Sequence, residues 1–314
     1  MPRRLAFLGP EGTFAHAALR TLPDADEAEL LPLANVTLVI DALRSGQADG
    51  AVVPLENSVE GGVPATLDEL AGGDPLVIAA EIYLPVLFDV LARPGTTLAG
   101  VRTVATHPHA EAQTRRWLID TLPAARVALV GSTAGGALAV AQGEYDAAIA
   151  PPIAGELYGL QTLAHDVADR HDATGDDAAV TRFVLLSRPG PPQPRTGNDR
   201  TTVVAYLRKD RAGALLELLS EFATRGINLT RIESRPTKAT IGDYCFSIDC
   251  EGHLDDERVG DAIAALHRVC AEVRYLGSYP RRDGEQGDVL PGRDDRDFTA
   301  ARAWMEQVRR TGAS

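Results

Sequence analysis

The sequence predicts an α/β fold of two domains, the first built from two similar lobes and the second of ferredoxin-like type. Three observations support this prediction. Short apolar runs alternate with helical patterns up to residue 187, one spaced motif occurs twice in that part, and a proline-rich stretch then precedes a different pattern. With 314 residues, the chain is long enough for more than one hydrophobic core.

The first domain is predicted over residues 1–187. Its apolar runs are continuous rather than alternating, which is typical of strands that helices cover on both faces. We expect such strands at residues 5–8, 50–53, 101–105, 127–130, 147–150 and 183–186. Helices are expected to end at Arg20, to lie near Ala65, and to cover residues 110–120 and 134–142.

The repeated motif has the form Gly-x-x-Asp-x-Ala-x-x-Pro and occupies residues 46–54 and again 143–151. In both copies the glycine follows a helical pattern, as at a helix C-cap, and the proline ends a strand. Helix, glycine and strand often follow one another in α/β proteins, so the match can be coincidental. The alternative is a pair of similar lobes facing each other across a cleft, where small ligands bind.

Four prolines within residues 188–194 predict a stiff, extended linker over 188–200, followed by a second domain over 201–280. In that domain we expect strands at 201–207, 229–235, 244–251 and 273–276, and helices at 214–225 and 256–270, the latter capped by Asp255. This order is the βαββαβ unit of ferredoxin-like folds. One face of the sheet is expected to stay uncovered, which favours pairing with another copy.

The tail, residues 281–314, is expected to end in an amphipathic helix over 298–309. Its apolar face carries Phe298, Ala301, Trp304, Met305 and Val308.

Composition excludes several classes of function. A formal net charge of -13 argues against nucleic acid and against an anionic membrane surface as partners. With neither a secretion signal nor an apolar run of membrane-spanning length, a cytoplasmic protein is expected. The three cysteines lie in the last third without zinc-ligand spacing, so we expect reduced thiols and no metal site. An anionic substrate would need a locally positive pocket.

Four loops lead from a predicted strand to a predicted helix, at residues 9–14, 54–62, 106–109 and 131–133. Backbone N–H groups and the helix dipole suit such positions to carboxylates or phosphates, and ligands of open α/β sheets bind at this edge. Residues 9–14 match neither a Walker loop nor GxGxxG, so no nucleotide cofactor is expected. Ser132 or Thr133 can equally be a plain N-cap, and His107 a residue that only starts a helix.

A fifth segment, Thr181-Arg182-Phe183, leads into the last strand of the first domain. Arg182 could pair with a substrate carboxylate, whereas a threonine at a strand start is ordinary by itself. The acidic stretch 165–177 before it indicates a solvated loop rather than a metal site.

Taken together, these motifs resemble prephenate dehydratase along residues 1–187. The segments that carry the resemblance are Gly9-Pro10-Glu11-Gly12-Thr13-Phe14, Glu56-Asn57-Ser58, His107-Pro108, Ser132-Thr133 and Thr181-Arg182-Phe183. The second domain resembles the ACT regulatory domain of that family. It carries the two motifs associated there with phenylalanine binding, Gly213-Ala214-Leu215-Leu216 and Glu233-Ser234-Arg235-Pro236.

The resemblance implies decarboxylating dehydration of prephenate to phenylpyruvate, a step of phenylalanine biosynthesis that needs no cofactor. It also implies a catalytic domain like the type II periplasmic binding proteins. Thr181 would be the catalytic residue and would donate a hydrogen bond to the departing hydroxyl, while Arg182 would face a carboxylate or brace Thr181. The remaining substrate-binding residues would be Thr13, Asn57, Ser58, His107, Ser132, Thr133 and Phe183.

For the second domain the resemblance implies allosteric control by phenylalanine at an ACT–ACT interface, and therefore a homodimer or homotetramer. The phenylalanine-binding residues would be Gly213, Ala214, Leu215, Leu216, Asn228, Glu233, Ser234, Arg235 and Pro236.

The chain departs from the family pattern at three places. The asparagine that usually stands just before Thr-Arg-Phe is absent, and Asp177 is its candidate substitute. His109 stands where glutamine is common, and Gly62 where serine is common. The alternative functions are an arogenate dehydratase and a non-catalytic amino-acid sensor; the intact Thr181 segment disfavours the sensor.

Overall fold

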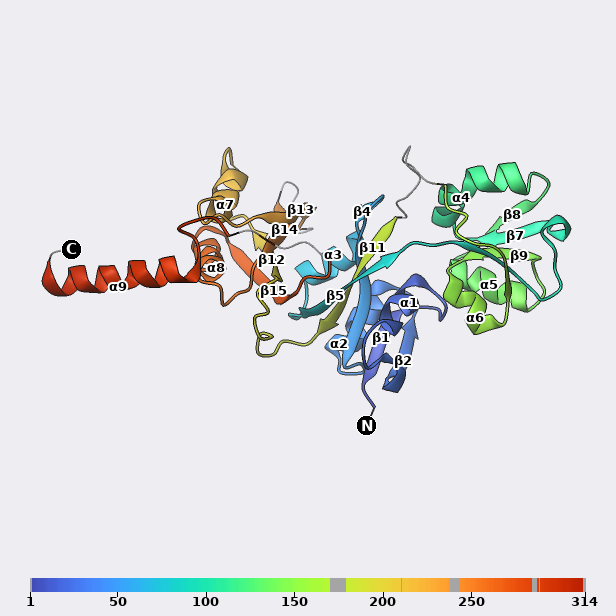
Figure 1. Cartoon of the computed structure of the whole chain (residues 1–314), viewed down its shortest axis with the longest axis horizontal. Coiled ribbons are helices and arrows are strands. Elements are labelled where there is room, and N and C mark those ends of the chain that lie inside the picture. The colour runs from blue at the N-terminus through green and yellow to red at the C-terminus, as the bar shows by residue number, and fades with distance from the viewer. Residues whose placement is uncertain are drawn as a thin grey trace. The chain divides into compact units, whose positions relative to one another are not determined.

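The computed structural model describes residues 2–169, 179–209, 211–237, 243–283, 287 and 289–312 (Figure 1). Asp177 and most of the acidic stretch before Thr181 lie outside the described residues. The chain divides into two compact units, Met1–Thr66 with Ile82–Val184 and Leu67–Glu81 with Leu185–Ser314. None of the described helices is both long enough and apolar enough to cross a membrane.

The first lobe is built around a six-stranded sheet with the order β2-β1-β3-β11-β5, in which β4 pairs with β3. Its strands are β1 (Arg4–Leu8), β2 (Glu29–Leu33), β3 (Gly50–Asn57), β4 (Gly61–Gly62), β5 (Val77–Pro85) and β11 (Val180–Ser187). Its helices are α1 (Phe14–Arg20), the 3-10 turn η1 (Ala25–Glu27), α2 (Val36–Arg44) and α3 (Pro64–Ala71). The first residues of β5, the last residues of β11 and most of α3 are assigned to the second compact unit.

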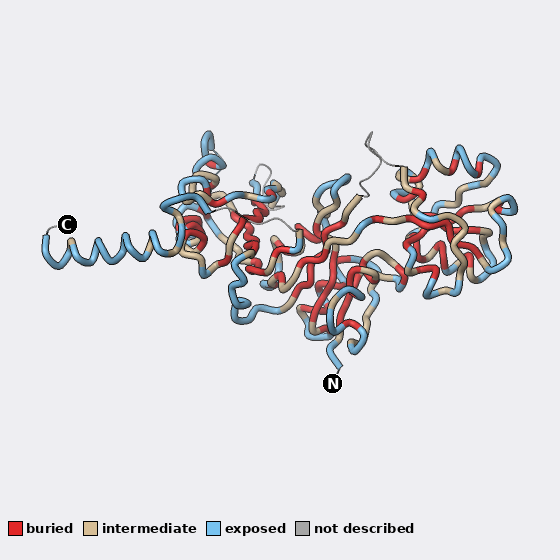
Figure 2. The backbone as a smooth tube through the Cα atoms, viewed as in Figure 1, coloured by how far each residue is buried: buried red, intermediate tan, exposed pale blue. Residues whose placement is uncertain are grey.

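The second lobe contains a five-stranded sheet with the order β10-β6-β9-β7-β8. Its strands are β6 (Asp89–Ala92), β7 (Thr103–Thr106), β8 (Arg126–Leu129), β9 (Ala147–Ala150) and β10 (Gln161–Ala164). Its helices are η2 (Leu98–Gly100), α4 (Pro108–Thr121), α5 (Thr133–Ala141) and α6 (Pro152–Tyr158). The central strands of both sheets are buried, as Figure 2 shows in red.

The repeated motif has the same structural role in each lobe. Gly46 and Gly143 follow α2 and α5 with φ of 77° and 89°, the left-handed conformation that glycine adopts without strain. Asp49 Oδ2 accepts from Arg4 N at the start of β1, and Asp146 Oδ2 accepts from Thr103 N at the start of β7, at 2.8 and 2.9 Å. The two lobes therefore share a local design.

Strand directions extend this equivalence. Strand β1 is parallel to both β2 and β3, and β7 is parallel to both β8 and β9. The chain passes to the second lobe between β5 and β6 and returns to the first between β10 and β11. These observations confirm the predicted two-lobed α/β fold.

The second unit contains the predicted βαββαβ domain, whose antiparallel sheet has the order β13-β14-β12-β15. Its elements are β12 (Asp199–Tyr206), α7 (Ala214–Ala223), β13 (Leu229–Pro236), β14 (Tyr244–Glu251), α8 (Glu257–Val269) and β15 (Glu272–Pro280). Its core joins apolar residues of α7 and α8, such as Leu218, Phe222 and Leu266, to Val203 and Ile248 of the sheet. The N-cap of α8 is Asp256, one residue later than expected.

The prediction of an uncovered sheet face is wrong over part of that face. Thr202, Ser247 and Asp249 are buried, although β-strand side chains of this polarity are typical of a solvated surface. Residues 67–81 of the same unit contact this domain, because Arg200 pairs with Glu81 and the Tyr206 hydroxyl donates to the Ala71 carbonyl. A segment from the middle of the chain thus belongs to the C-terminal unit.

The last helix, α9 (Asp295–Thr311), is longer than predicted. Its expected apolar face is present, but none of its residues is buried.

Candidate active site and effector site

A cavity of about 360 Å³ in the first unit is lined by residues of both lobes. Its lining includes the predicted site residues Thr13, Asn57, His107, Ser132, Thr133, Thr181 and Phe183. These residues come from helix starts and from strands β3 and β11, which are far apart in the sequence. The fold therefore gathers most of the residues that the motifs singled out.

Thr181 is the second residue of β11 and is 8% exposed. Asn57 Nδ2, at the end of β3, donates a hydrogen bond to Thr181 Oγ1 at 2.9 Å. The Oδ1 atom of the same amide accepts from the backbone N–H groups of Val59 and Glu60, at 2.9 and 3.1 Å. Because those N–H groups can only donate, the Asn57 amide must present its NH₂ group to Thr181.

This arrangement sets the direction of the Thr181 hydroxyl. One lone pair of Oγ1 accepts from Asn57, and within the described part of the chain the hydroxyl donates to no protein acceptor. Its proton is therefore available for a hydrogen bond to a ligand in the cavity.

Arg182 and Ser58 do not line the cavity. Side chains alternate along a strand, so Thr181 and Phe183 face the cavity while Arg182 points to the other side of the sheet. There its guanidinium group is buried and lies 3.7 Å from the Glu56 carboxylate. Ser58 Oγ accepts from Val180 N, and Ser58 N donates to Val180 O, both at 2.9 Å, so Ser58 fixes the start of β11.

Three helices begin at the cavity, and their N-caps are predicted site residues. Ser132 Oγ accepts from Gly135 N at the start of α5, at 2.9 Å. At the start of α1, Thr13 Oγ1 accepts from His16 N and donates to Leu8 O at 2.9 Å, so the Thr13 hydroxyl proton is already used. At the start of α4, His107 Nδ1 accepts from His109 N at 3.3 Å. Helix N-termini carry partial positive charge, which suits the cavity to an anion.

The two histidines of the third loop have different environments. Burial lowers the pKa of His107, the nearby His109 lowers it further, and Glu60 opposes both. A neutral His107 can keep accepting at Nδ1 near pH 7. The rings of His107 and His109 are 5.1 Å apart, and His109 Nδ1 lies 3.1 Å from a Glu60 carboxylate oxygen. Since Glu60 follows β3 and His109 belongs to α4, this pair joins the two lobes at the cavity.

The motifs did not single out several lining residues. Phe14 and Phe88 form an edge-to-face pair with ring centroids 5.4 Å apart, which gives the cavity an apolar wall. Phe88 lies between β5 and β6 outside any motif, so no sequence signal marks it. Glu60 and His109 are adjacent to motif residues, but nothing in the neighbouring sequence indicates that their side chains contact each other.

Among the described residues, no group of three or more His, Cys, Asp or Glu side chains is placed to hold a metal ion. The cysteines Cys245, Cys250 and Cys270 are free and buried, and burial raises the pKa of each thiol.

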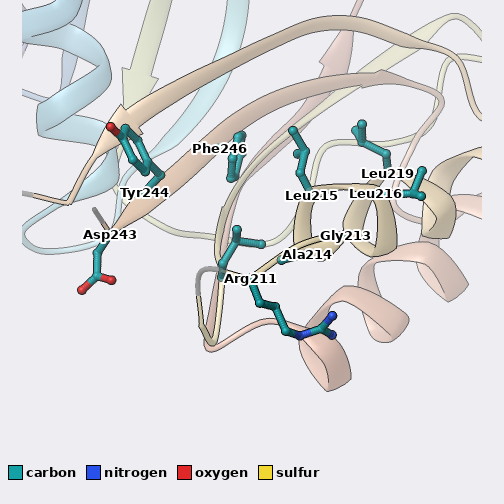
Figure 3. Close-up of a pocket in the computed structure, with 10 residues that line it drawn as sticks. Arg211, Gly213, Ala214, Leu215, Leu216, Leu219, Asp243, Tyr244 and Phe246 are labelled. Carbon is teal, nitrogen blue, oxygen red and sulfur yellow. The ribbon is translucent and has the colours of Figure 1, made fainter. Parts of the chain in front are cut away.

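A second cavity, of about 480 Å³, lies in the ferredoxin-like domain. Its lining includes four residues of the predicted effector motif, Gly213, Ala214, Leu215 and Leu216. Figure 3 shows Leu215 and Leu219 extending from α7 toward the strand that carries Tyr244 and Phe246. Gly213 is the N-cap of α7 with φ of 85°, a conformation that favours glycine. Leu215, Leu216 and Tyr244 remain partly exposed, at 38%, 68% and 46%.

The other five predicted effector residues do not line this cavity: Asn228, Glu233, Ser234, Arg235 and Pro236. All but Asn228 lie on the edge strand β13, where Ser234 and Pro236 stand opposite Phe246 and Tyr244 of β14.

Two of these side chains have partners elsewhere in the second unit. Arg235 Nε and Nη2 both donate to Asp68 Oδ1 at 2.9 Å. Asn228 Nδ2 donates to Glu251 Oε1 at 3.1 Å.

Comparison with known proteins agrees with this geometry. The family model described as prephenate dehydratase matches residues 5–191, and that of the ACT domain matches residues 201–268. A prephenate dehydratase of Amycolatopsis methanolica is 51% identical over 309 residues, which cover 98% of each chain.

Two solved structures are similar over most of the chain. One is a prephenate dehydratase from Arthrobacter aurescens in complex with L-Phe, with 46% identity, a TM-score of 0.90, and coverage of 98% of this chain and 99% of that one. The other is GqqA, described as a novel type of quorum quenching acylase, with 31% identity, a TM-score of 0.79, and coverage of 90% and 99%. This chain belongs to the prephenate dehydratase family and carries a C-terminal ACT domain.

Proposed function

We propose that this chain converts prephenate to phenylpyruvate, carbon dioxide and water, and that phenylalanine controls the reaction through the ACT domain. Loss of the ring carboxylate and of the ring hydroxyl makes the ring aromatic, so the driving force lies in the substrate. The protein has to bind an anion, hold the ring, and help the hydroxyl leave. Family membership and the geometry of the cavity support this function.

The observation that carries the proposal is the hydrogen bond from Asn57 Nδ2 to Thr181 Oγ1. It occupies one acceptor site of the hydroxyl and leaves the proton to be donated to the departing hydroxyl of the substrate. A neutral threonine is a weak acid, so we expect a hydrogen bond that strengthens as negative charge develops rather than full proton transfer, and the departing hydroxide takes up a proton from solvent to become water. Assistance of this kind contributes about 100-fold to 10,000-fold.

Other features of the cavity support binding of this substrate. The starts of α4 and α5, at His107 and Ser132, place backbone dipoles where carboxylates would bind. Ser132 and Thr133 add hydroxyl groups, while Phe14, Phe88 and Phe183 provide apolar surface for the ring. In this proposal Arg182 and Ser58 act through the sheet, by holding Glu56 and the start of β11.

For the effector, we propose that phenylalanine binds at the cavity of the ACT domain. In this proposal a second copy of the chain completes the binding site. The relative from Arthrobacter aurescens was solved with L-Phe, and this chain's cavity is apolar and lined by the motif 213–216. The remaining motif residues lie on the edge strand β13, which a second copy could reach. A homodimer or homotetramer follows from this proposal.

The experiment is to mix purified full-length protein with prephenate, without added metal or cofactor, and to measure phenylpyruvate. Formation of phenylpyruvate that phenylalanine suppresses supports the proposal. Turnover of arogenate but not of prephenate would assign the chain to arogenate dehydration instead. Binding of phenylalanine with no turnover of either compound would indicate an amino-acid sensor.

A further inference from the structure

The helix α9 is well formed at both ends. Asp294 caps it, since its side chain accepts from Arg296 N and Asp297 N while Asp297 accepts in return from Asp294 N. Gly312, with φ of 68°, ends the helix in a left-handed turn. Its first turns are attached to the rest of the unit, because Asp295 pairs with Arg195 and Arg302 pairs with Glu257 of α8. The helix therefore has a fixed starting point.

An apolar stripe runs along this helix and is at most partly covered by the described residues, since Phe298 and Val308 are half-buried. Phe298, Ala301, Met305 and Val308 follow one another at i, i+3, i+7 and i+10, which places them on one side of the helix, with Trp304 beside them. No residue of α9 is buried, and Trp304 and Met305 are 51% and 40% exposed. Figure 2 shows the helix exposed along most of its length. A continuous apolar stripe of this kind marks an interaction surface.

We infer that α9 pairs antiparallel with α9 of a second copy of this chain. The order of side-chain sizes along the stripe supports that register. With the two helices centred on residue 303, Phe298 of one copy faces Val308 of the other, and Ala301 faces Met305. Each contact then joins a large residue to a smaller one, which lets the two stripes interdigitate.

The charges at the two ends support the same orientation. The first turn carries Asp295 and Asp297, and the last turn carries Arg309 and Arg310. In the antiparallel register the acidic first turn of each copy lies level with the basic last turn of the other, at both ends of the pair. A parallel pair would instead place acidic turns side by side and basic turns side by side. The same patch on both copies forms a closed two-fold contact, so the pairing ends at two chains per stripe.

Cysteine cross-linking of the full-length chain tests the register. The variant F298C/V308C should form a covalent dimer under mild oxidation, whereas F298C alone and V308C alone should stay at the wild-type level. Within one helix the two positions are about 15 Å apart, too far for a disulfide, so any cross-link joins two chains. The wild-type protein is a suitable negative control because its own cysteines are buried. Equal cross-linking of the single variants, or none of the double variant, overturns the antiparallel pairing.

A matched pair of charge substitutions tests the stripe itself. Met305→Glu should raise the dissociation constant of the α9-dependent association at least tenfold in sedimentation equilibrium, while Ala303→Glu, on the opposite side of the helix, should leave it unchanged. Circular dichroism confirms that both variants keep their helices. In a Trp117→Phe background, which leaves Trp304 as the one tryptophan, blue-shifted emission that does not change on dilution would show burial against the same chain, and would overturn the inference. Equal assembly of Met305→Glu and wild type would do the same.

Discussion

The two cavities of this molecule differ in how completely one chain builds them. The cavity of the first unit is surrounded by two lobes, and its polar groups are held by hydrogen bonds within the chain. The cavity of the ACT domain is lined on one side by α7 and β14, with Leu216 and Tyr244 largely exposed. Half of its predicted motif lies one strand away, on the edge strand β13.

This difference matches two kinds of task. A chemical step needs donors held in place before the substrate arrives, because reorganising them during the reaction would raise the barrier. An effector site can be left incomplete in one chain if, as proposed above, a second copy closes it, because binding is then coupled to assembly. The predictions below test whether the first cavity is preorganised and whether the second is open.

The largest effect is expected from Thr181. Thr181→Val keeps the shape of the side chain but removes the hydroxyl, so kcat should fall at least about 100-fold. Thr181→Ser, which keeps the donor, should retain much of the activity. The rate of phenylpyruvate formation measures both variants, with circular dichroism as the check on folding. A Val variant with near-normal turnover would remove Thr181 from the chemistry.

Asn57 should have a smaller effect, because it acts through Thr181. In Asn57→Asp one carboxylate oxygen can keep the contacts to Val59 and Glu60, but the other accepts the Thr181 proton instead of donating to Oγ1. We expect kcat to fall on the order of tenfold, with KM little changed. Activity should partly recover as the pH is lowered and the new carboxyl is protonated. A loss that is independent of pH would argue that Asn57 is only structural.

A substitution in the lining of the ACT cavity should change the response to phenylalanine without changing the basal rate. Leu215→Ala removes apolar surface at the opening and should weaken phenylalanine binding about tenfold. Leu157→Ala, at an exposed position on α6 outside both cavities, is the matched control. Calorimetry and the phenylalanine concentration for half-inhibition measure the effect. Unchanged binding in Leu215→Ala would place the effector elsewhere.

The smallest effect concerns the pH dependence of stability. Burial lowers the pKa of His107 below its ordinary value of 6.5. As the pH falls below 6.5, the unfolded chain takes up a proton before the folded one does, so the free energy of unfolding decreases. His107→Asn keeps an N-cap but does not titrate. Its Tm should therefore fall less than that of wild type between about pH 7.5 and about pH 5.5.

The contribution of His16, whose pKa burial also lowers, is common to both proteins and cancels in this comparison. An equal fall in Tm for the variant and wild type would show that His107 does not contribute.

Much of the fold could be predicted from local pattern. The strand predicted at 244–251 coincides with β14, because its length and bounding residues are visible in the sequence. Strands β2, β4, β5, β6 and β10 are not among the predicted strands. Strand β2 contains Pro32, a residue that argues against a strand, and β6 and β10 have only four residues each. Their pairing partners, not their composition, make them strands.

The sequence by itself determined which residues are chemically suited to the site, since motif order and residue type singled out Thr181, Asn57, His107 and Ser132. Only the tertiary structure decided which groups the residues of these motifs contact. It turned Arg182 away from the cavity by strand alternation and used the Thr13 hydroxyl to bind Leu8. It also brought Glu60 of one lobe to His109 of the other. A motif records residue identity, whereas the direction of a side chain and its partners depend on contacts between segments distant in sequence.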